Sequence, residues 1–267
     1  MLLSTFYNHI LSASKERNSS ISDIAKELMQ SDIYGIEFLL KTYTDEHLPN
    51  IKLLREMGMF VNSIPAHTDI IHGGTKEYMD ELIRKALAVD TKKIMLIPGF
   101  LAEGEDRDEM IDRSVPVVSY LCDKAEENGI VIGLEDYGDP TSPLYTSEGM
   151  LRYLKQIPKL TCTFDTGNFD YNGEDTYKAY KKLKKYINGH IHCKDHTREE
   201  LDENSQLPFR ELAIGDGYLP IRKILKKLFK SGFDGSVTIE VFGSRDTLDD
   251  IKKSAEFIKS IYMRYHR

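Results

Sequence analysis

Residues 160–194 read LTCTFDTGNFDYNGEDTYKAYKKLKKYINGHIHCK, and the order of elements in this stretch indicates the fold class. It begins with a short run rich in β-branched and aromatic residues, continues through an amphipathic segment typical of a helix, and ends in a second strand-like run. Parallel neighbouring strands need a crossover connection of this kind, which is usually a helix. The stretch therefore predicts one β–α–β unit of a parallel sheet.

Short strand-like runs recur along the whole chain, and helix-like segments lie between them. The expected strands are 2–7, 33–39, 59–65, 93–97, 130–135, 160–165, 189–194 and 236–242. The expected helices are 22–30, 45–57, 76–89, 108–128, 147–156, 174–186, 219–230 and 249–262. Ser22 and Ser147 are the expected N-caps of two of these helices, since serine is a preferred capping residue.

Two architectures accommodate this alternation of strands and helices. An open doubly wound sheet usually carries a glycine-rich phosphate turn after its first strand, but residues 6–15, FYNHILSASK, contain no glycine. Eight strand–helix units without a linker instead predict the α/β class and a (β/α)₈ TIM barrel, with residues 1–267 as a single domain. Residues 197–217 are the longest stretch expected to be irregular, and they are long enough for a functional loop.

The composition narrows the classes of partner. Among 267 residues, 36 Lys and Arg stand against 43 Asp and Glu, and the resulting net charge of −7 disfavours nucleic acid as the main ligand. No apolar run approaches the roughly 18 residues of a membrane span, and the N-terminus lacks the pattern of a signal peptide. Three cysteines do not make a disulfide framework. We therefore expect a cytoplasmic protein without a membrane or nucleic-acid partner.

Polar residues end the last four expected strands. Glu135 ends the fifth, Asp165 the sixth, His192 lies near the end of the seventh, and Glu240 near the end of the eighth. In each strand these residues alternate with apolar ones that suit the helix layer, so their side chains are expected to point into the barrel. Active sites of such barrels lie at the C-terminal ends of the strands. The four side chains are therefore expected to meet at one rim.

Three crowded carboxylates repel one another, and a divalent cation resolves that repulsion. Three carboxylates with one imidazole form an oxygen-rich set that suits Mn²⁺, Mg²⁺ or Co²⁺ better than it suits a thiolate-type Zn²⁺ site. Three of the four residues have a specific alternative interpretation: a solvated loop acid for Glu135, an Asx turn in Asp-Thr-Gly-Asn for Asp165, and a core histidine for His192. The matching phase of all four on successive strands favours the metal site.

The chain resembles the xylose isomerase-like TIM barrel superfamily, the sugar phosphate isomerase/epimerase family, over nearly its whole length. The motifs that carry the resemblance are Ile36-Glu37, Leu134-Glu135, FDTGN at 164–168, HIHCKD at 190–195, IGDG at 214–217 and Ile239-Glu240. The resemblance implies that Glu135, Asp165, His192 and Glu240 bind one metal ion. It also implies that Glu135 and Glu240 are the catalytic acid and base. Mn²⁺ is the expected ion, with Mg²⁺, Co²⁺ and Zn²⁺ as alternatives.

Further residues are expected to contact the substrate. Glu37 and His67 end the second and third strands, and Lys194 shares the inward phase of His192. Loop polarity is the alternative interpretation for Glu37 and His67, and structural ion pairing is the alternative for Lys194. Asn168 stands where the ketose 3-epimerases have a histidine, which weakens the transfer of their substrate to this chain. Arg198 matches an arginine that those epimerases use on substrate, and a solvated surface position is its alternative.

The resemblance implies a divalent-metal-dependent isomerase or epimerase acting on a sugar, a sugar phosphate or a polyol ketone, by proton transfer through a metal-stabilised enediolate. One alternative is a metal-dependent lyase on the same barrel, which would dehydrate an inosose or cleave a carbon-linked glycoside. A second alternative is a non-catalytic sugar-binding subunit. The expected partner is a small sugar or sugar phosphate, and the chain is also a candidate homo-oligomer.

Overall fold

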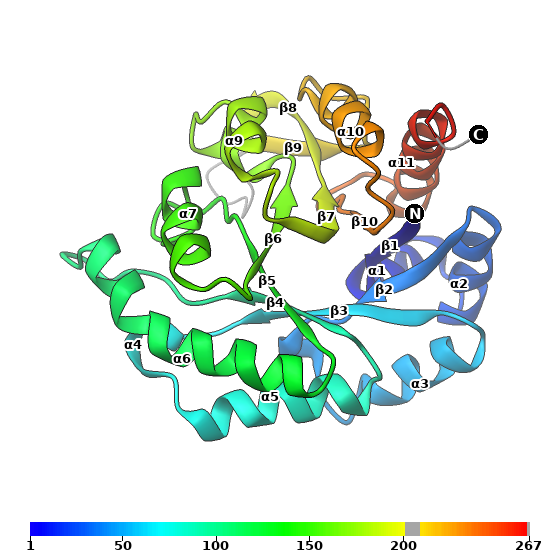
Figure 1. The fold of residues 1–267 in the computed structure, drawn as a ribbon. Coiled ribbons are helices and arrows are strands. Elements are labelled where there is room, and N and C mark those ends of the chain that lie inside the picture. Colours follow the sequence, from blue (N-terminus) through cyan, green and yellow to red (C-terminus); the bar gives the residue numbers. More distant parts are fainter. Residues whose placement is uncertain (201–208, 266–267) are drawn as a thin grey trace.

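Eight parallel strands close into a barrel in the computed structural model, which describes residues 1–200 and 209–265 (Figure 1). Around the barrel the order is β1, β10, β7, β6, β5, β4, β3 and β2, so the first and last strands close the ring. The strands are β1 (Leu2–Phe6), β2 (Ile33–Glu37), β3 (Phe60–His67), β4 (Lys93–Ile97), β5 (Val131–Glu135), β6 (Thr161–Asp165), β7 (Ile187–Cys193) and β10 (Ser236–Ile239). This confirms the predicted single-domain (β/α)₈ barrel.

Helices surround the barrel and cover its outer face (Figure 1). They are α1 (Tyr7–Arg17), α2 (Ile21–Gln30), α3 (Leu48–Glu56), α4 (Ile70–Gly73), α5 (Lys76–Ala88), α6 (Arg107–Glu127), α7 (Ser147–Gln156), α8 (Asn168–Tyr171), α9 (Thr176–Leu183), α10 (Ile221–Lys230) and α11 (Thr247–Tyr262), with the 3₁₀ turn η1 (Leu40–Thr42). Helix α10 shows why they pack there. Its buried residues are Ile221, Ile224, Leu225, Leu228 and Phe229, which form one apolar stripe of helical period.

The structure differs from the sequence prediction in some helices, in two caps and in one connection. Helix α1 follows β1 directly, and α4 and α8 are short helices, where no helix was expected. The capping side chains of α2 and α7 are Ser20 and Thr146, so the prediction of Ser22 and Ser147 was wrong. The observed caps lie two residues and one residue before the predicted ones. The stretch expected to be irregular contains an antiparallel pair, β8 (Asp195–Glu200) and β9 (Phe209–Leu212). This hairpin extends from the end of β7 and therefore lies next to the predicted site.

The two faces of the barrel strands differ in polarity. Ile191, Cys193, Val237 and Ile239 are buried, and they alternate along β7 and β10 with the inward residues.

All three cysteines are free and buried. Within the described part of the chain, no helix is both long and apolar enough to cross a membrane.

Candidate metal centre

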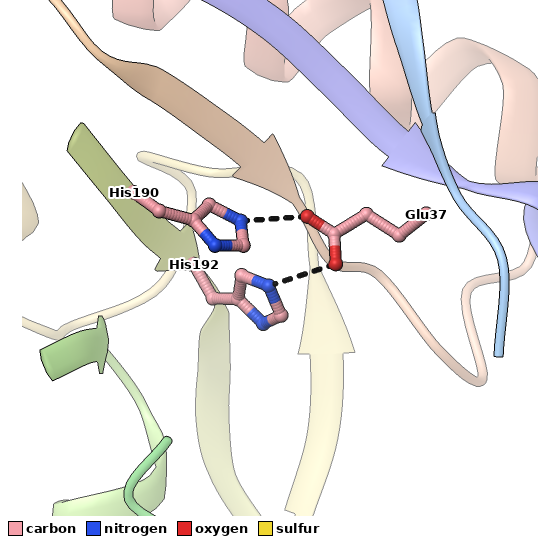
Figure 2. Close-up of side chains that lie close together, drawn as sticks. All are labelled: Glu37, His190 and His192. Carbon is pink, nitrogen blue, oxygen red and sulfur yellow. Dashed lines mark hydrogen bonds and ion pairs between the residues drawn. The ribbon is translucent and has the colours of Figure 1, made fainter. Parts of the chain in front are cut away.

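Strand ends place the four predicted ligands at one rim of the barrel. Glu135 is the last residue of β5 and Asp165 the last of β6, and Asp165 pairs in register with His192 of β7. Glu240 directly follows β10, where its N–H donates a 3.0 Å hydrogen bond to the carbonyl of Cys193. His192 points into the barrel beside His190, two residues earlier on β7 (Figure 2). All four predicted ligands are buried.

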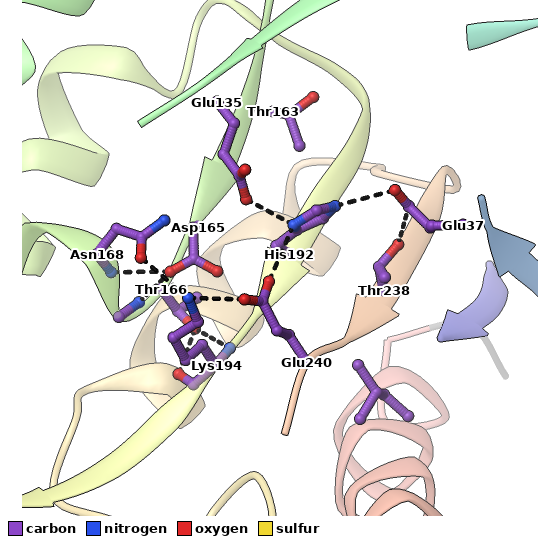
Figure 3. A network of polar contacts seen from close by, with 12 residues as sticks. Glu37, Glu135, Thr163, Asp165, Thr166, Asn168, His192, Lys194, Thr238 and Glu240 are labelled. Atoms are coloured by element: carbon purple, nitrogen blue, oxygen red, sulfur yellow. Dashed lines mark hydrogen bonds and ion pairs between the residues drawn. The ribbon is translucent and has the colours of Figure 1, made fainter. Parts of the chain in front are cut away.

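The ligand atoms of Glu135, Asp165, His192 and Glu240 lie within 4.8 Å of one another (Figure 3). Nδ1 of His192 is 2.6 Å from Oε1 of Glu135 and 3.3 Å from Oε2 of Glu240. Despite this proximity, Nδ1 of His192, Oε1 of Glu135 and Oδ2 of Asp165 make no aligned hydrogen bond to any of residues 1–200 and 209–265. Buried polar atoms without partners are rare in folded proteins and need an explanation. Donor atoms that converge on one point without bonding to each other fit a divalent cation as their common partner.

Asp165 uses its two oxygens differently. Oδ1 accepts hydrogen bonds from the N–H groups of Gly167 (2.7 Å) and Asn168 (2.8 Å), so it forms the Asx turn considered as an alternative for this residue. Oδ2 has no hydrogen-bond partner among the described residues and belongs to the cluster. The turn and the ligand interpretations are therefore compatible in one side chain.

Burial and neighbouring charges shift the pKa values of the carboxyls in the cluster. Burial raises the pKa of the Glu135 carboxyl to about 7, against the opposing effect of His192. Burial also raises the pKa of Asp165, although Lys194 opposes this shift. For Glu240, burial is outweighed by Lys194 and His192, and the pKa falls to about 2. A divalent cation would take the place of the protons that such crowded carboxyls otherwise retain.

Lys194 is the cation nearest to the predicted ligands. Its Nζ lies 2.7 Å from Oε1 of Glu240 and donates a 3.0 Å hydrogen bond to Oδ1 of Asn168. The Asn168 amide in turn donates to the carbonyl of Asp136 at 2.7 Å, which fixes its orientation. Lys194 and Asn168 are both buried beside the cluster, so the structure brings these two predicted substrate contacts to the site.

Glu37 is surrounded by side-chain hydrogen-bond donors. It is fully buried, and its carboxylate accepts from Asn62, Ser63 and Thr238. Its two oxygens face the rings of His190 and His192, at 2.6 Å and 3.4 Å (Figure 2). Burial is the largest influence on Glu37, but the two histidines outweigh it and hold its pKa well below the usual range. This environment fits an internal anion that orders its neighbours.

The remaining two predicted contacts, His67 and Arg198, are exposed. The His67 ring meets the Tyr137 ring edge-on at 5.3 Å. His67 also lines a hollow of about 420 Å³ with Asp69, Ile70 and Tyr78, and no predicted metal ligand lines that hollow. The Arg198 guanidinium lies 4.5 Å from the centre of the Tyr218 ring, which is its contact among the described residues. The structure does not bring either side chain into contact with the cluster.

Two buried acids at the site were not predicted. Asp136 follows Glu135, and its Oδ1 accepts a 2.9 Å hydrogen bond from the N–H of Asp165. Glu211 of β9 lies 3.8 Å from Nζ of Lys194 and accepts from the hydroxyl of Tyr171 at 3.3 Å. The acidic pair Glu135-Asp136 at a strand end was the available signal for the first. No local pattern marks Glu211, because only the hairpin brings it to the site.

Comparison with known proteins agrees with the observed barrel. A family model described as a xylose isomerase-like TIM barrel matches residues 52–261. An uncharacterized protein of Methanocaldococcus jannaschii is 30% identical over 190 residues, 69% of this chain and 61% of the relative. An inosose dehydratase of Lacticaseibacillus casei is 25% identical over 142 residues, 50% of this chain and 47% of the relative. The matches thus span only about half to three fifths of these relatives.

Solved structures match over almost the whole chain. An IOLI protein with a bound zinc atom superposes with a TM-score of 0.77 at 17% identity, covering 99% of both chains. An L-ribulose 3-epimerase superposes with a TM-score of 0.74 at 17% identity, covering 100% of this chain and 96% of the other. At these identities the likeness shows the fold, and the chemistry has to be argued from the site itself.

Proposed function

Because the chain belongs to the xylose isomerase-like TIM barrel family, we propose that it is a divalent-metal-dependent isomerase or epimerase of a sugar, a sugar phosphate or a polyol ketone. The observation that carries this proposal is a set of buried donor atoms on Glu135, Asp165 and His192 that lie close together and make no hydrogen bond within the described part of the chain. Glu240 completes the set. The names of solved neighbours that are sugar epimerases support the same class of substrate.

The proposed ligands are Glu135, Asp165, His192 and Glu240. Their donor set of carboxylate oxygens and one imidazole nitrogen suits Mn²⁺ best, with Mg²⁺, Co²⁺ and Zn²⁺ as alternatives. When bound, the ion supplies Lewis-acid polarisation of a substrate carbonyl. That polarisation makes the neighbouring C–H group more acidic, which is the requirement for the proton transfers assigned below.

Glu135 and Glu240 are the proposed proton-transfer pair. They approach His192 from β5 and from the end of β10, on two sides of the ring (Figure 3). In the proposed reaction one carboxylate removes the proton from the carbon beside the carbonyl, and the other carboxyl returns a proton to that carbon or its neighbour. Return to the same carbon from the opposite face gives an epimer, and return to the neighbouring carbon gives an isomer.

Lys194 and Asn168 are the proposed substrate contacts beside this pair. The Lys194 ammonium is buried and held between Glu240 and Asn168, so it can stabilise negative charge that develops on a substrate oxygen. His67 and Arg198 stay proposed contacts at the outer rim, where a longer substrate or its phosphate group would reach them. Glu37 is proposed to act on His192, as argued below.

A second reaction, elimination of water, is favoured by Glu211. Its Oε2 is buried and makes no hydrogen bond to a residue that the structure describes, and burial raises the pKa of this carboxyl well above its usual value, against the effect of Lys194. A protonated carboxyl here can give its proton to a departing hydroxyl, which then leaves as water after the same initial C–H deprotonation. The similarity to an inosose dehydratase supports testing this reaction.

Proton exchange in D₂O tests the proposal. The protein is incubated with Mn²⁺ and a panel of ketoses, aldoses, their phosphates and inososes, and proton NMR is read after chelation of the metal. We expect metal-dependent loss of one C–H signal, with a new stereoisomer or isomer for the primary proposal and a product lighter by one water for elimination. If the metal binds and no substrate of the panel exchanges a proton, the primary proposal is wrong and a binding role replaces it.

A further inference from the structure

Glu37 connects both inward-facing histidines of β7. Its Oε1 lies 2.6 Å from Nε2 of His190, and its Oε2 lies 3.4 Å from Nε2 of His192 (Figure 2). The glutamate extends from β2, on the opposite side of the barrel from β5 and β6. His192 therefore has the predicted metal ligands at Nδ1 and a carboxylate at Nε2.

Glu37, His190 and His192 also have the composition of a metal site, and their donor atoms lie within 4.8 Å of one another. Their hydrogen bonds argue against a second ion. Oε1 of Glu37 already accepts from Asn62 at 2.9 Å and from Thr238 at 2.6 Å, besides His190. A cation there would have to displace these donors, whereas Glu135, Asp165 and His192 each offer the other set an atom that makes no hydrogen bond to a described residue. The Glu37 group is therefore complete as a hydrogen-bonded anion.

The neighbours of His190 also fix its own ring. Nδ1 of His190 lies 3.4 Å from the hydroxyl of Thr163, while its Nε2 faces Glu37. With a proton on Nε2, both nitrogens have partners: Glu37 accepts from Nε2 and Thr163 donates to Nδ1. The carboxylate of Glu37 is thus held in place by four neighbours besides His192: Asn62, Ser63, Thr238 and His190.

From this geometry we propose that Glu37 is a positioning residue that accepts the Nε2 proton of His192 and so leaves Nδ1 free to bind the metal. A histidine ligand commonly donates its second ring N–H to a carboxylate, which fixes the tautomer and the ring orientation. The 3.4 Å separation of Nε2 and Oε2 is at the long end for a hydrogen bond, and Nε2 makes no aligned hydrogen bond to Glu37 or to any other described residue, so the proposed bond needs a small reorientation of the ring. The inference rests on the metal site of the proposed function.

The first test uses the wild-type protein loaded with Zn²⁺, so that its outcome does not depend on a variant that folds. Nitrogen-15 NMR of the histidine side chains reports which ring nitrogen carries the proton. We expect His192 to be protonated at Nε2 and to bind the ion through Nδ1. Protonation at Nδ1, or binding through Nε2, overturns the inference while leaving the metal site intact. A wild-type protein that binds no ion overturns both the inference and the proposed function.

The second test replaces the carboxylate. In Glu37→Gln, one amide orientation turns an N–H toward Nε2 of His192, and the other turns it toward Asn62, Thr238 and His190. We expect the variant to bind Co²⁺ about 10- to 100-fold more weakly than wild type, with a changed Co²⁺ absorption spectrum. The matched control is Ser4→Ala, because Ser4 is buried in the same interior and bonds Thr238 at 2.7 Å without reaching Glu37. Equal Co²⁺ affinity and an unchanged spectrum in Glu37→Gln overturn the inference.

Discussion

Nζ of Lys194 lies 2.7 Å from Oε1 of Glu240, whereas the ion pairs of Glu135 among the described residues involve His192 alone. The two glutamates proposed for proton transfer therefore have different electrostatic surroundings. Lys194 and His192 hold the pKa of Glu240 at about 2, while burial raises that of Glu135 to about 7. This difference makes the two positions separable by experiment.

Replacing either glutamate by glutamine is expected to remove one metal ligand and one proton carrier. In Glu135→Gln and Glu240→Gln we expect C–H exchange in D₂O to fall at least ~100-fold, the lower range for loss of a general acid or base. Mn²⁺ affinity is expected to fall as well. The matched control is Glu256→Gln on the exposed face of α11, which should keep both properties. Normal folding with full exchange in both site variants would show that the pair is assigned incorrectly.

Metal affinity is expected to depend on pH through Glu135. Its pKa is raised by burial to about 7 in the metal-free protein, so the folded state binds a proton there more tightly than the unfolded chain does. Stability of the metal-free protein should therefore fall as pH rises from about 4.5 to about 7, with a total effect of order 3 kcal/mol. A bound cation displaces that proton, so affinity should rise over the same window. Mn²⁺ titrations between pH 5 and 8 measure this, and Glu135→Gln should flatten the dependence.

Removal of the lysine charge should affect the metal-free protein most. Breaking a buried ion pair by removing one partner costs about 3–5 kcal/mol, because the other charge stays buried without compensation. In Lys194→Met we expect such a loss in denaturant unfolding without metal, and a smaller one with Mn²⁺ bound to Glu240. C–H exchange should fall with metal binding retained. The same loss in both metal states would contradict the proposed sharing of Glu240 between the lysine and the ion.

Gly167 offers a way to displace Lys194 without changing its charge. A Cβ at this position would lie 2.9 Å from Cγ and from Cδ of Lys194, which is too close, so the lysine side chain has to move. In Gly167→Ala we expect slower C–H exchange with Mn²⁺ affinity within about threefold of wild type. Comparison with Lys194→Met is the control, because the double variant should be no slower than Lys194→Met alone if both act through the lysine.

The fold and the main cluster were accessible from the sequence because their signals are local and periodic. The alternation of side chains along a strand predicts that Asp165 and His192 point into the barrel. The location of active sites at the C-terminal strand ends predicts the rim on which the two residues meet. Glu211 was inaccessible, since its approach to Lys194 depends on how β9 pairs with β8 across residues 201–208, which lie outside the described residues. The surroundings of Glu37 were not predicted for another reason. The alternation of side chains along a strand indicates the direction in which a side chain points, but not how many hydrogen-bond donors surround it.

The two oxygens of Asp165 have different partners, so the backbone amides bound to one oxygen should report metal binding at the other. Its Oδ1 holds the amides of Gly167 and Asn168, while its Oδ2 belongs to the cluster. Charge drawn toward one oxygen of a carboxylate weakens the other as an acceptor, so occupancy of the rim should change the amide proton shifts of these two residues. Binding of a diamagnetic ion such as Mg²⁺ or Zn²⁺ could then be followed from backbone spectra alone, without added substrate.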